Sequence, residues 1–404
     1  MVVNINYYIL LSFLLLSGYL AFSKRLKNSS NWKAMVTPLA SIMGSGFLVS
    51  APLLAGIVGV WAVFCMSILL IIAYAVGSAI RFNIQYFEPI EHQEGVAQSI
   101  AFISRIVLAG AYFISVTYYL QLLAAFALKS FGIQHEIYAN IITTILLLLI
   151  GGVGMYKGLQ KLEQLETYAI SLNLGMIGSL ILGLIIYNSS LAIDGNWHLP
   201  EISSLIDFND IRVLLGLLIV VQGFETSRYL GDEHPSSQRI TTMKQAQLLS
   251  AGIYIVFISL ATVLFHDGLK ADVTAIISMI APVAITLPIL VAIAAIGSQF
   301  SAAVADNSAA GGLIEEITKR KLPLRYAYGL IMFITIALTW ETNVNTIIAY
   351  ASRAFALFYM LQSLVALITA YNNKEIENRT FKIAQFTLVA IICLLVFVLG
   401  IPAE

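Results

Sequence analysis

The sequence consists mainly of apolar runs that are long enough to cross a lipid bilayer. A transmembrane helix needs about 20 mostly apolar residues. Only 11% of the 404 residues are charged, whereas a typical soluble domain carries roughly 25%. We therefore predict an all-α membrane protein with about 12 transmembrane helices. The predicted spans are 6–23, 34–57, 58–82, 98–130, 136–155, 163–187, 210–230, 243–265, 273–312, 325–341, 343–371 and 380–401. The run 273–312 exceeds one simple span, which predicts tilt or a cytoplasmic extension.

The positive charges predict how these spans are oriented. If the N-terminus lies outside and the spans alternate, nearly all of the 22 Lys and Arg residues fall on one side. The exceptions are Lys129, Arg212 and Lys270 on the outer side and Arg353 within a span. Cytoplasmic loops carry such an excess of positive charge. We predict a multi-pass protein of the cell membrane with both termini outside. No basic residue precedes 6–23, so we read this run as a retained span rather than a signal peptide.

The sequence lacks the residues that several classes of function need. The formal net charge is zero, so no basic surface predicts a nucleic-acid partner. Cys65 and Cys393 both lie in apolar runs, which predicts neither a disulfide framework nor a metal site. The sequence contains no His-Glu-x-x-His, Gly-x-Ser-x-Gly or Walker motif. We therefore expect no enzyme activity, no ATP-driven pump and no cofactor beyond a coupling ion. The expected partners are a lipid bilayer and a small-molecule substrate.

Two spans contain residues that interrupt a helix. The first, 34–57, includes Met43-Gly44-Ser45-Gly46-Phe47, and the second, 210–230, includes Val221-Gln222-Gly223-Phe224-Glu225-Thr226-Ser227. Non-helical backbone at membrane depth must be buried in protein or line a watery cavity. Such glycine clusters also serve close helix packing, which is the plainer interpretation. Paired interruptions at matching places in two inverted halves are typical of a transporter site between the halves.

The spacing of the interruptions predicts an internal repeat. Five spans begin with each interrupted span, and because five is odd the two halves have opposite orientation. The predicted parts are a leading helix and cytoplasmic loop (1–33), a first repeat (34–187), an outer loop (188–209), a second, inverted repeat (210–371), and a loop with a final helix (372–404).

These residues resemble motifs of the amino acid–polyamine–organocation (APC) transporter superfamily. Its first core span typically carries a Gly-Ser-Gly-Ile-type motif, similar to Gly44-Ser45-Gly46-Phe47. Its sixth typically carries Gly-Phe-Glu followed by an acidic pair, Pro and Arg, similar to Gly223-Phe224-Glu225, Asp232-Glu233, Pro235 and Arg239. Gly158 to Glu163 and Leu322-Pro323 match more loosely. The resemblance covers 34–371 and implies a leucine-transporter-like fold with one extra helix on each side, the leading one being a departure from the family.

The resemblance also implies where a substrate binds. A carboxylate would lie against the N–H donors and positive dipole of the first broken span. Gly44, Ser45 and Gly46, with Met43 beside them, would form this part of the site. Gln222, Gly223 and Phe224 would line the amino end and part of a gate. Tyr112 and Tyr119 share a helical face and either complete the site or serve as packing aromatics.

Coupling to an ion gradient has several candidate residues. Glu225 lies at membrane depth, where a carboxyl group is by default a functional candidate; it would exchange a proton, or bind unpaired N–H groups, or pair with Arg228. Ser298 and Ser301 lie on one face of the eighth core span and are candidate sodium ligands, or packing serines. Asp306, further along that span, is a candidate residue for either proton or sodium coupling. We expect Arg353, near mid-bilayer, to pair with Glu225 or Asp306, or to contact an anionic substrate.

The sequence therefore predicts a secondary transporter of an amino acid or related small amine or organic solute. It would work by alternating access, as a permease or symporter driven by protons or sodium. The alternatives are a sodium-coupled or exchanging carrier of another small ion, and a non-concentrative channel or receptor. A metal-ion transporter of this fold would need Asp and Asn in the first broken span, where Gly44-Ser45-Gly46 stands.

Overall fold

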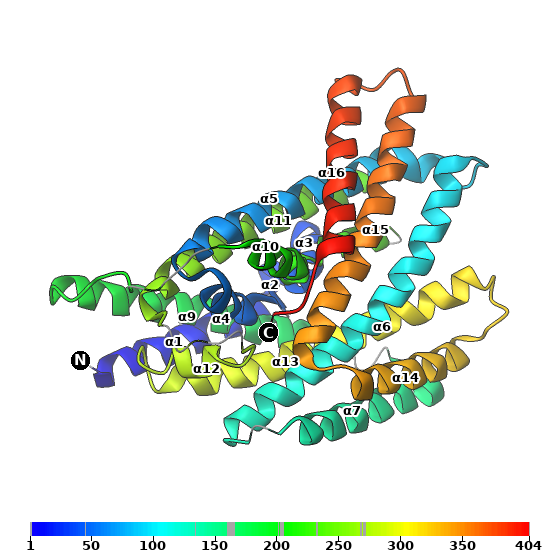
Figure 1. Ribbon diagram of the computed structural model, residues 1–404. Coiled ribbons are helices and arrows are strands. Elements are labelled where there is room, and N and C mark those ends of the chain that lie inside the picture. The colour runs from blue at the N-terminus through cyan, green and yellow to red at the C-terminus, as the bar shows by residue number, and fades with distance from the viewer. Residues whose placement is uncertain are drawn as a thin grey trace.

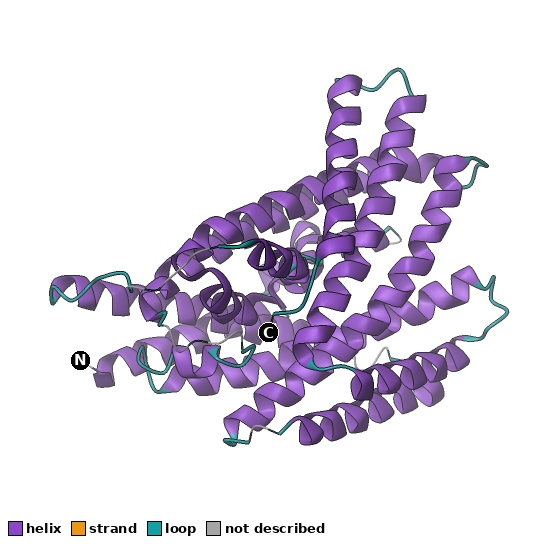
Figure 2. Cartoon of the chain, in the orientation of Figure 1, coloured by secondary structure: helices purple, strands orange, loops and turns teal. Residues whose placement is uncertain are grey.

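The protein is helical throughout the part that the structure describes. The computed structural model describes residues 2–44, 46–133, 135–159, 166–200, 202, 206–231, 233–266, 269 and 272–403. Within these ranges the backbone forms helices and loops and contains no strand (Figure 2). The prediction of an all-α protein is confirmed.

The longer helices match the predicted apolar runs. They are α1 (Val2–Phe22), α3 (Ser30–Gly44), α4 (Gly46–Val58), α5 (Ala62–Phe82), α6 (Val96–Ser130), α7 (Glu136–Lys157), α9 (Glu166–Ile193), α11 (Ser236–Ala261), α13 (Thr286–Ile317), α14 (Leu324–Glu341), α15 (Val344–Asn372) and α16 (Arg379–Leu399). The shorter elements are α2 (Lys24–Lys27), η1 (Gly59–Trp61), η2 (Asn83–Phe87), η3 (Glu88–Ile90), α10 (Phe208–Gly216), η4 (Leu218–Val221), η5 (Phe224–Tyr229), η6 (Thr262–Leu264) and α12 (Ile276–Met279).

Nine helical stretches of the described chain are long and apolar enough to cross a membrane. One of them, Ser30–Ile90, contains two predicted spans. The predicted spans 210–230 and 325–341 correspond to α10–η5 and α14, which are not among the nine. The single long span 273–312 was wrong, because the chain there divides into α12 and α13. Pro282 lies in the turn between them, and proline disfavours helical backbone at the residue before it.

The two predicted interruptions lie at the centre of the molecule. The second is confirmed: α10, η4 and η5 follow one another as short pieces, and Gly223 between η4 and η5 has φ of 116°. The first falls on Ser45, which lies outside the described residues, between the end of α3 and the start of α4. α11 contacts α3, α4, α5 and η5 and so holds both interrupted spans.

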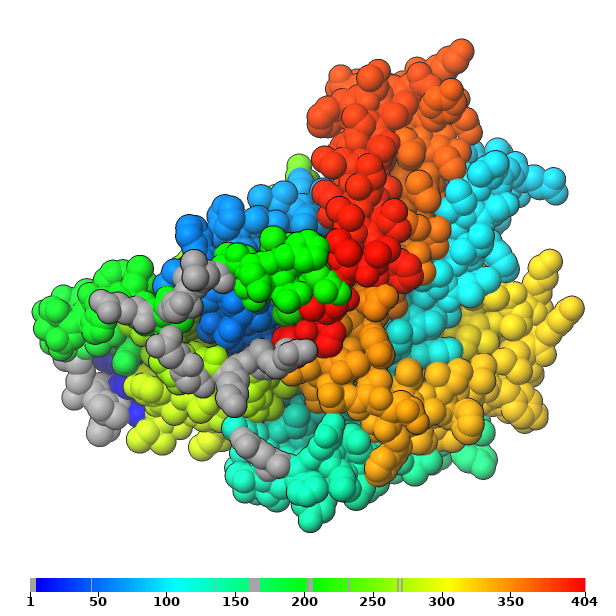
Figure 3. Space-filling view, in the orientation of Figure 1, coloured from blue at the N-terminus to red at the C-terminus, as the bar shows by residue number. Residues whose placement is uncertain are grey.

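The remaining helices surround these central pieces. α6 packs against both α13 and α15, and α14 lies along α7 (Figure 1). α15 and α16 form an antiparallel pair, and the C-terminal residues, red in Figure 3, lie against α10 and α15. Many large apolar side chains on the outside are exposed, including Leu14, Ile71, Phe333 and Phe381. Such exposure suits helices that face lipid.

The leading helix α1 packs along α9 on a row of glycines. A Cβ atom on Gly175 would lie 2.0 Å from Ser17 Oγ, and one on Gly178 would lie 2.6 Å from Leu16 Cδ1. Small residues let transmembrane helices approach closely. α1 also reaches α13, because Asn6 Oδ1 accepts hydrogen bonds from Thr286 N (3.1 Å) and Thr286 Oγ1 (3.0 Å). The extra helix is therefore joined to two helices of the core.

Replacing Gly175 by Leu should weaken the attachment of α1. The added side chain must displace Ser17, and overpacking of this kind costs about 1–3 kcal/mol. We expect a lower midpoint of thermal unfolding in detergent for Gly175→Leu. Gly252→Leu is the matched control, because a Cβ at Gly252 meets nothing within 4 Å. Equal midpoints for the two variants would contradict the close α1–α9 contact.

Candidate functional site

The two interrupted spans touch each other through their backbones. A Cβ on Gly46 would lie 2.2 Å from the carbonyl oxygen of Val220 in η4. Reciprocally, a Cβ on Gly223 would lie 2.4 Å from Ser41 Oγ and 2.6 Å from the Ser41 carbonyl carbon in α3. Each span therefore places one glycine against the other span. This contact fixes how the two interrupted spans meet.

Side chains from neighbouring helices satisfy the backbone groups around this contact. Asn173 Nδ2 of α9 donates to the Met43 carbonyl oxygen at 3.0 Å. The Tyr254 hydroxyl of α11 lies 3.1 Å from the Ile42 carbonyl oxygen and 2.5 Å from that of Val220. Groups at helix ends lack partners within the helix and need such side chains when buried. The bonds of Tyr254 therefore join both interrupted spans.

A small polar cavity of about 70 Å³ lies beside the contact. It is bounded by α3, α9 and α13, with single residues from α6 and η5. Its polar side chains are mostly hydroxyls, with one amide and one carboxyl group: Thr37, Ser41, Tyr119, Asn173, Thr226, Ser298, Ser301 and Asp306. The carboxyl group of Asp306 accepts a hydrogen bond from Ser115 Oγ. No lysine or arginine is among the described residues that line it.

One oxygen of the cavity wall lacks a hydrogen-bond partner within the described part of the chain. Asn173 is 2% exposed, and its Oδ1 atom is buried without such a partner. Its amide nitrogen is already bound to Met43, which fixes the side-chain orientation. A buried unpaired acceptor is costly. Asn173 therefore combines a backbone contact at the interruption with a buried amide oxygen that has no partner among the described residues.

Glu225 belongs to a second cluster, outside the residues that line this cavity. Its side chain is 2% exposed. Glu225 Oε2 accepts hydrogen bonds from Gly223 N at 3.0 Å and from the Tyr359 hydroxyl at 2.8 Å. The Tyr359 hydroxyl also lies 3.0 Å from Gln222 Oε1, and the Phe224 ring stacks on the Tyr359 ring at 5.4 Å. The carboxyl group thus binds the unpaired N–H at the interruption and has no ion pair among the described residues.

The structure divides the predicted site residues into groups. Those that line the cavity are Gly44, Tyr119, Ser298, Ser301 and Asp306. Those in the Glu225 cluster are Gln222, Gly223, Phe224 and Glu225. Gly46 and Met43 lie at the contact between the spans, Tyr112 packs edge-on against Phe355 at 6.0 Å, and Ser45 lies outside the described residues.

The pairing predicted for Arg353 is wrong. Its Nε donates to the Phe397 carbonyl oxygen at 2.8 Å, and its guanidinium lies 5.8 Å from the centre of the Phe397 ring. Arg212 Nε likewise donates to the Leu399 carbonyl oxygen at 3.2 Å. Both arginines therefore donate hydrogen bonds to carbonyl groups in the last turn of α16. Carbonyl groups there lack partners within the helix, and the helix dipole favours a cation. The partners of Glu225 are Gly223 and Tyr359 instead.

Sequence reasoning missed Asn173, Tyr254 and Tyr359. All three are polar residues inside apolar runs, which is the signal that could have identified them. Their partners are distant along the chain: Asn173 binds Met43, Tyr254 binds Val220 and Tyr359 binds Glu225. Helical periodicity gives the face of one helix but not the helix that it meets.

A larger cavity of about 740 Å³ lies at the end of the molecule predicted to be outside. It is lined by the end of α6, the start of α7, the start of α15, the segment 272–274 and residues 402–403. Lys129 Nζ lies 3.7 Å from Asp272 Oδ2 at its edge. This cavity and the small one have no lining residue in common.

Comparisons with known proteins agree with this architecture. A family model described as "APC superfamily transporter" matches residues 24–400. An uncharacterized protein of Aquifex aeolicus (strain VF5) is 39% identical over 409 residues, covering 99% of this chain and 98% of that protein. Crystal structures of a manganese transporter of Eremococcus coleocola share the fold. A mutant of it with one histidine replaced by alanine has a TM-score of 0.60, and a mutant with one glutamate replaced by alanine has 0.58. Each is 14% identical over 93% of this chain and 87% of the other.

Gly46→Ala should disrupt the contact between the interrupted spans. The methyl group would lie 2.2 Å from a backbone oxygen, which cannot rotate away as a flexible side chain can. We expect a loss of roughly 1–3 kcal/mol in stability, measured as a lower unfolding midpoint in detergent. Gly110→Ala is the control, because a Cβ there meets nothing within 4 Å. A Gly46→Ala protein as stable as the control would refute the close approach.

Arg353→Ala should lower stability without changing ion coupling. Loss of the hydrogen bond to Phe397 removes a charge-assisted contact worth about 1.5–3 kcal/mol. Unfolding midpoints and uptake at several sodium concentrations and pH values would check both parts. A shift in the sodium or pH dependence of uptake would show that Arg353 does act on the coupling groups.

Proposed function

Because the chain belongs to the APC superfamily of transporters, we propose that it is a secondary active transporter of an amino acid or related small amine or organic solute. The observation that carries this proposal is the meeting of two interrupted spans, through Gly46 and Gly223, beside a polar cavity. Interrupted helices at the interface of inverted repeats are where secondary transporters bind substrate. The protein would expose this region to each side of the membrane in turn, by movement of the interrupted spans against the surrounding helices.

The chemistry around the interruptions supports an organic solute. N–H groups and the positive dipole at helix N-termini attract a carboxylate. Carbonyl, hydroxyl and carboxyl oxygens around the cavity suit an amino group, because they accept its hydrogen bonds. A divalent metal ion, the solute named for the Eremococcus protein, is a poorer fit. Asp306 is the only carboxyl group among the described cavity residues, and the described residues contain no cluster of three His, Cys, Asp or Glu side chains.

Two groups of residues offer a route to coupling. Glu225 is a buried carboxyl group bound by neutral donors, so that it could take up and release a proton. Gly44, Ser298, Ser301 and Asp306 line the small cavity, and Ser298 Oγ lies 3.5 Å from the Gly44 carbonyl oxygen. Sodium prefers hard oxygen ligands of the kinds that these residues carry. We propose that one of these groups carries the coupling ion.

Glu225→Gln should abolish accumulation that is driven by an ion gradient. Glutamine keeps an oxygen that can accept the hydrogen bonds from Gly223 and Tyr359, but it cannot hold a charge or release a proton. The measurement is uptake by proteoliposomes of a panel of amino acids, amines and organic acids, with imposed sodium and pH gradients tested separately.

Tyr359→Phe is the companion variant in this experiment. It removes a hydrogen bond to Glu225 but leaves the carboxyl group able to ionise. Full concentrative uptake by Glu225→Gln would remove this residue from the coupling role and favour the cavity oxygens. Flux without accumulation in the unmodified protein would favour a channel over a coupled transporter.

A further inference from the structure

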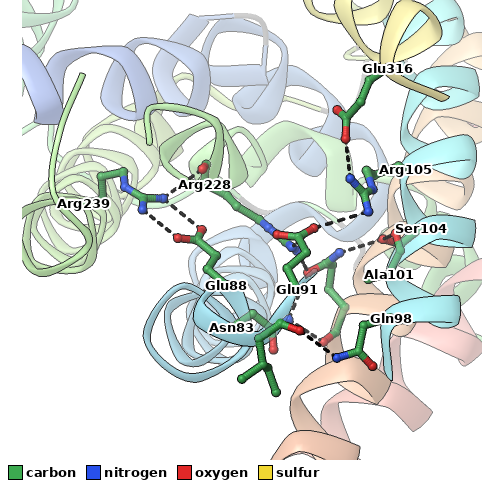
Figure 4. Close-up of polar contacts among 12 residues, drawn as sticks. Asn83, Glu88, Glu91, Gln98, Ala101, Ser104, Arg105, Arg228, Arg239 and Glu316 are labelled. Carbon is green, nitrogen blue, oxygen red and sulfur yellow. Dashed lines mark hydrogen bonds and ion pairs between the residues drawn. The ribbon is translucent and has the colours of Figure 1, made fainter. Parts of the chain in front are cut away.

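A network of arginine and glutamate side chains joins several elements at the end of the molecule that is predicted to face the cytoplasm (Figure 4). Its charged members are Arg105, Arg228 and Arg239 with Glu88, Glu91 and Glu316. They come from six places in the chain: η3, the residue that follows it, α6, η5, α11 and α13. The three positive and three negative charges balance.

The interrupted spans and their neighbours (α3–α5, η2–η5 and α11) form what we call the inner group. One ion pair of the network, Arg239–Glu88, lies within it. Arg239 binds Glu88 through two hydrogen bonds, of 3.0 and 2.7 Å. Arg239 Nη1 also donates to the Arg228 carbonyl oxygen at 2.9 Å. The side chain of Arg239 is 5% exposed. These bonds join α11, η3 and η5 to one another.

Another ion pair lies within the surrounding helices, which we call the outer group (α6, α13 and α15). Arg105 of α6 pairs with Glu316 near the end of α13. α6 and α13 pack against each other along their lengths. This pair therefore joins two members of the outer group and would persist if the inner group moved.

Glu91 stands between the two groups. It directly follows η3, and its Oε1 atom lies 3.6 Å from Arg228 Nη2 in the inner group and 3.4 Å from Arg105 Nη2 in the outer group. Among the described residues, the pair Glu91–Arg105 is the ion pair of this network that crosses from one group to the other. The Glu91 side chain is 23% exposed, so water reaches it and the contact is reversible.

Gln362 of α15 also joins the two groups, through hydrogen bonds of its uncharged amide. Its Oε1 atom accepts from Arg228 Nη1 and, at 3.0 Å, from Asn83 Nδ2, while its Nε2 donates to Ser104 Oγ at 2.8 Å. Asn83 and Arg228 belong to the inner group, and Ser104 to the outer group. Gln362 is 1% exposed. At this end the inner and outer groups are thus joined by one partly exposed ion pair, Glu91–Arg105, and by the buried hydrogen bonds of Gln362.

We infer that Glu91 is the latch residue that holds the cytoplasmic end closed and is released when that end opens. The inference rests on the proposed function, since alternating access requires the inner and outer groups to separate at this end. Among the described residues, none of the inner group lines the cavity of about 740 Å³ at the opposite end, so that cavity does not bear on this contact. The inference rests on the ion pair Glu91–Arg105 and on the hydrogen bonds of Gln362, which join the two groups at the predicted cytoplasmic end.

Thiol labelling tests the latch without knowledge of the solute. Thr37 lines the small cavity on α3, and the native Cys65 and Cys393 are buried, so background labelling is low. In a Thr37→Cys background, membrane-impermeant maleimide is applied from each side of the membrane in turn. Glu91→Gln should raise the labelling rate from the cytoplasmic side about fivefold, the effect of losing one partly exposed ion pair.

Glu94→Gln is the matched control for Glu91→Gln. Glu94 lies three residues further along the same segment, is exposed and forms none of the ion pairs of the network, so the change in charge is the same. Arg105→Gln provides a second route to the same effect. Combined with Glu91→Gln, it should raise the rate less than the product of the two single effects, because both variants break the same Glu91–Arg105 pair.

The outcomes separate the latch from the proposed function. Equal labelling rates with and without Glu91→Gln, or an equal rise in Glu94→Gln, would overturn the role of Glu91. Faster labelling of Glu91→Gln with no accumulation of any solute would leave the latch standing and refute coupled transport. Accumulation together with unchanged labelling in Glu91→Gln and Arg105→Gln would support transport and refute the latch.

Discussion

The architecture depends on the backbone contact between the two interrupted spans. Gly46 admits the Val220 carbonyl group and Gly223 admits Ser41, so each interrupted span supplies the small residue that the other needs. A side chain at either glycine would force the spans apart. The hydroxyl of Tyr254 then lies between carbonyl groups of both spans. Because these groups are buried where lipid and protein exclude water, every free carbonyl needs such a partner, which explains why polar residues occur in otherwise apolar helices.

Two kinds of polar chemistry lie near this contact. The small cavity is lined by hydroxyl, amide and carboxyl side chains, chiefly from α3, α9 and α13. Outside the residues that line the cavity, Glu225 accepts hydrogen bonds from Gly223 and Tyr359. Each place contains one carboxyl group, Asp306 in the cavity and Glu225 in the cluster. The ion-pair network at the predicted cytoplasmic end is a third, distinct polar region, and its charges balance.

Local patterns in the sequence predicted local features well. Apolar runs located most of the long helices, and glycine with polar residues located the interruption at Gly223, because bilayer thickness and backbone hydrogen bonding constrain each segment by itself. Partners across the fold could not be predicted. Arg353 binds the end of α16 rather than a carboxyl group, and Asn173 binds Met43. These contacts depend on helix rotation and packing between segments distant in the chain, about which hydropathy carries no information.

The packing of α1 on α9 has a consequence for biosynthesis. The ribosome delivers the chain from its N-terminus, so α1 enters the bilayer well before α9 has been made. Until then Leu16 and Ser17 face lipid or other protein, and the glycines that will receive them do not yet exist. Asn6 likewise can bind Thr286 only after the start of α13 has been made, which is later than α9. α1 therefore reaches its final contacts only after α9 and α13, which follow it in the chain, have been made.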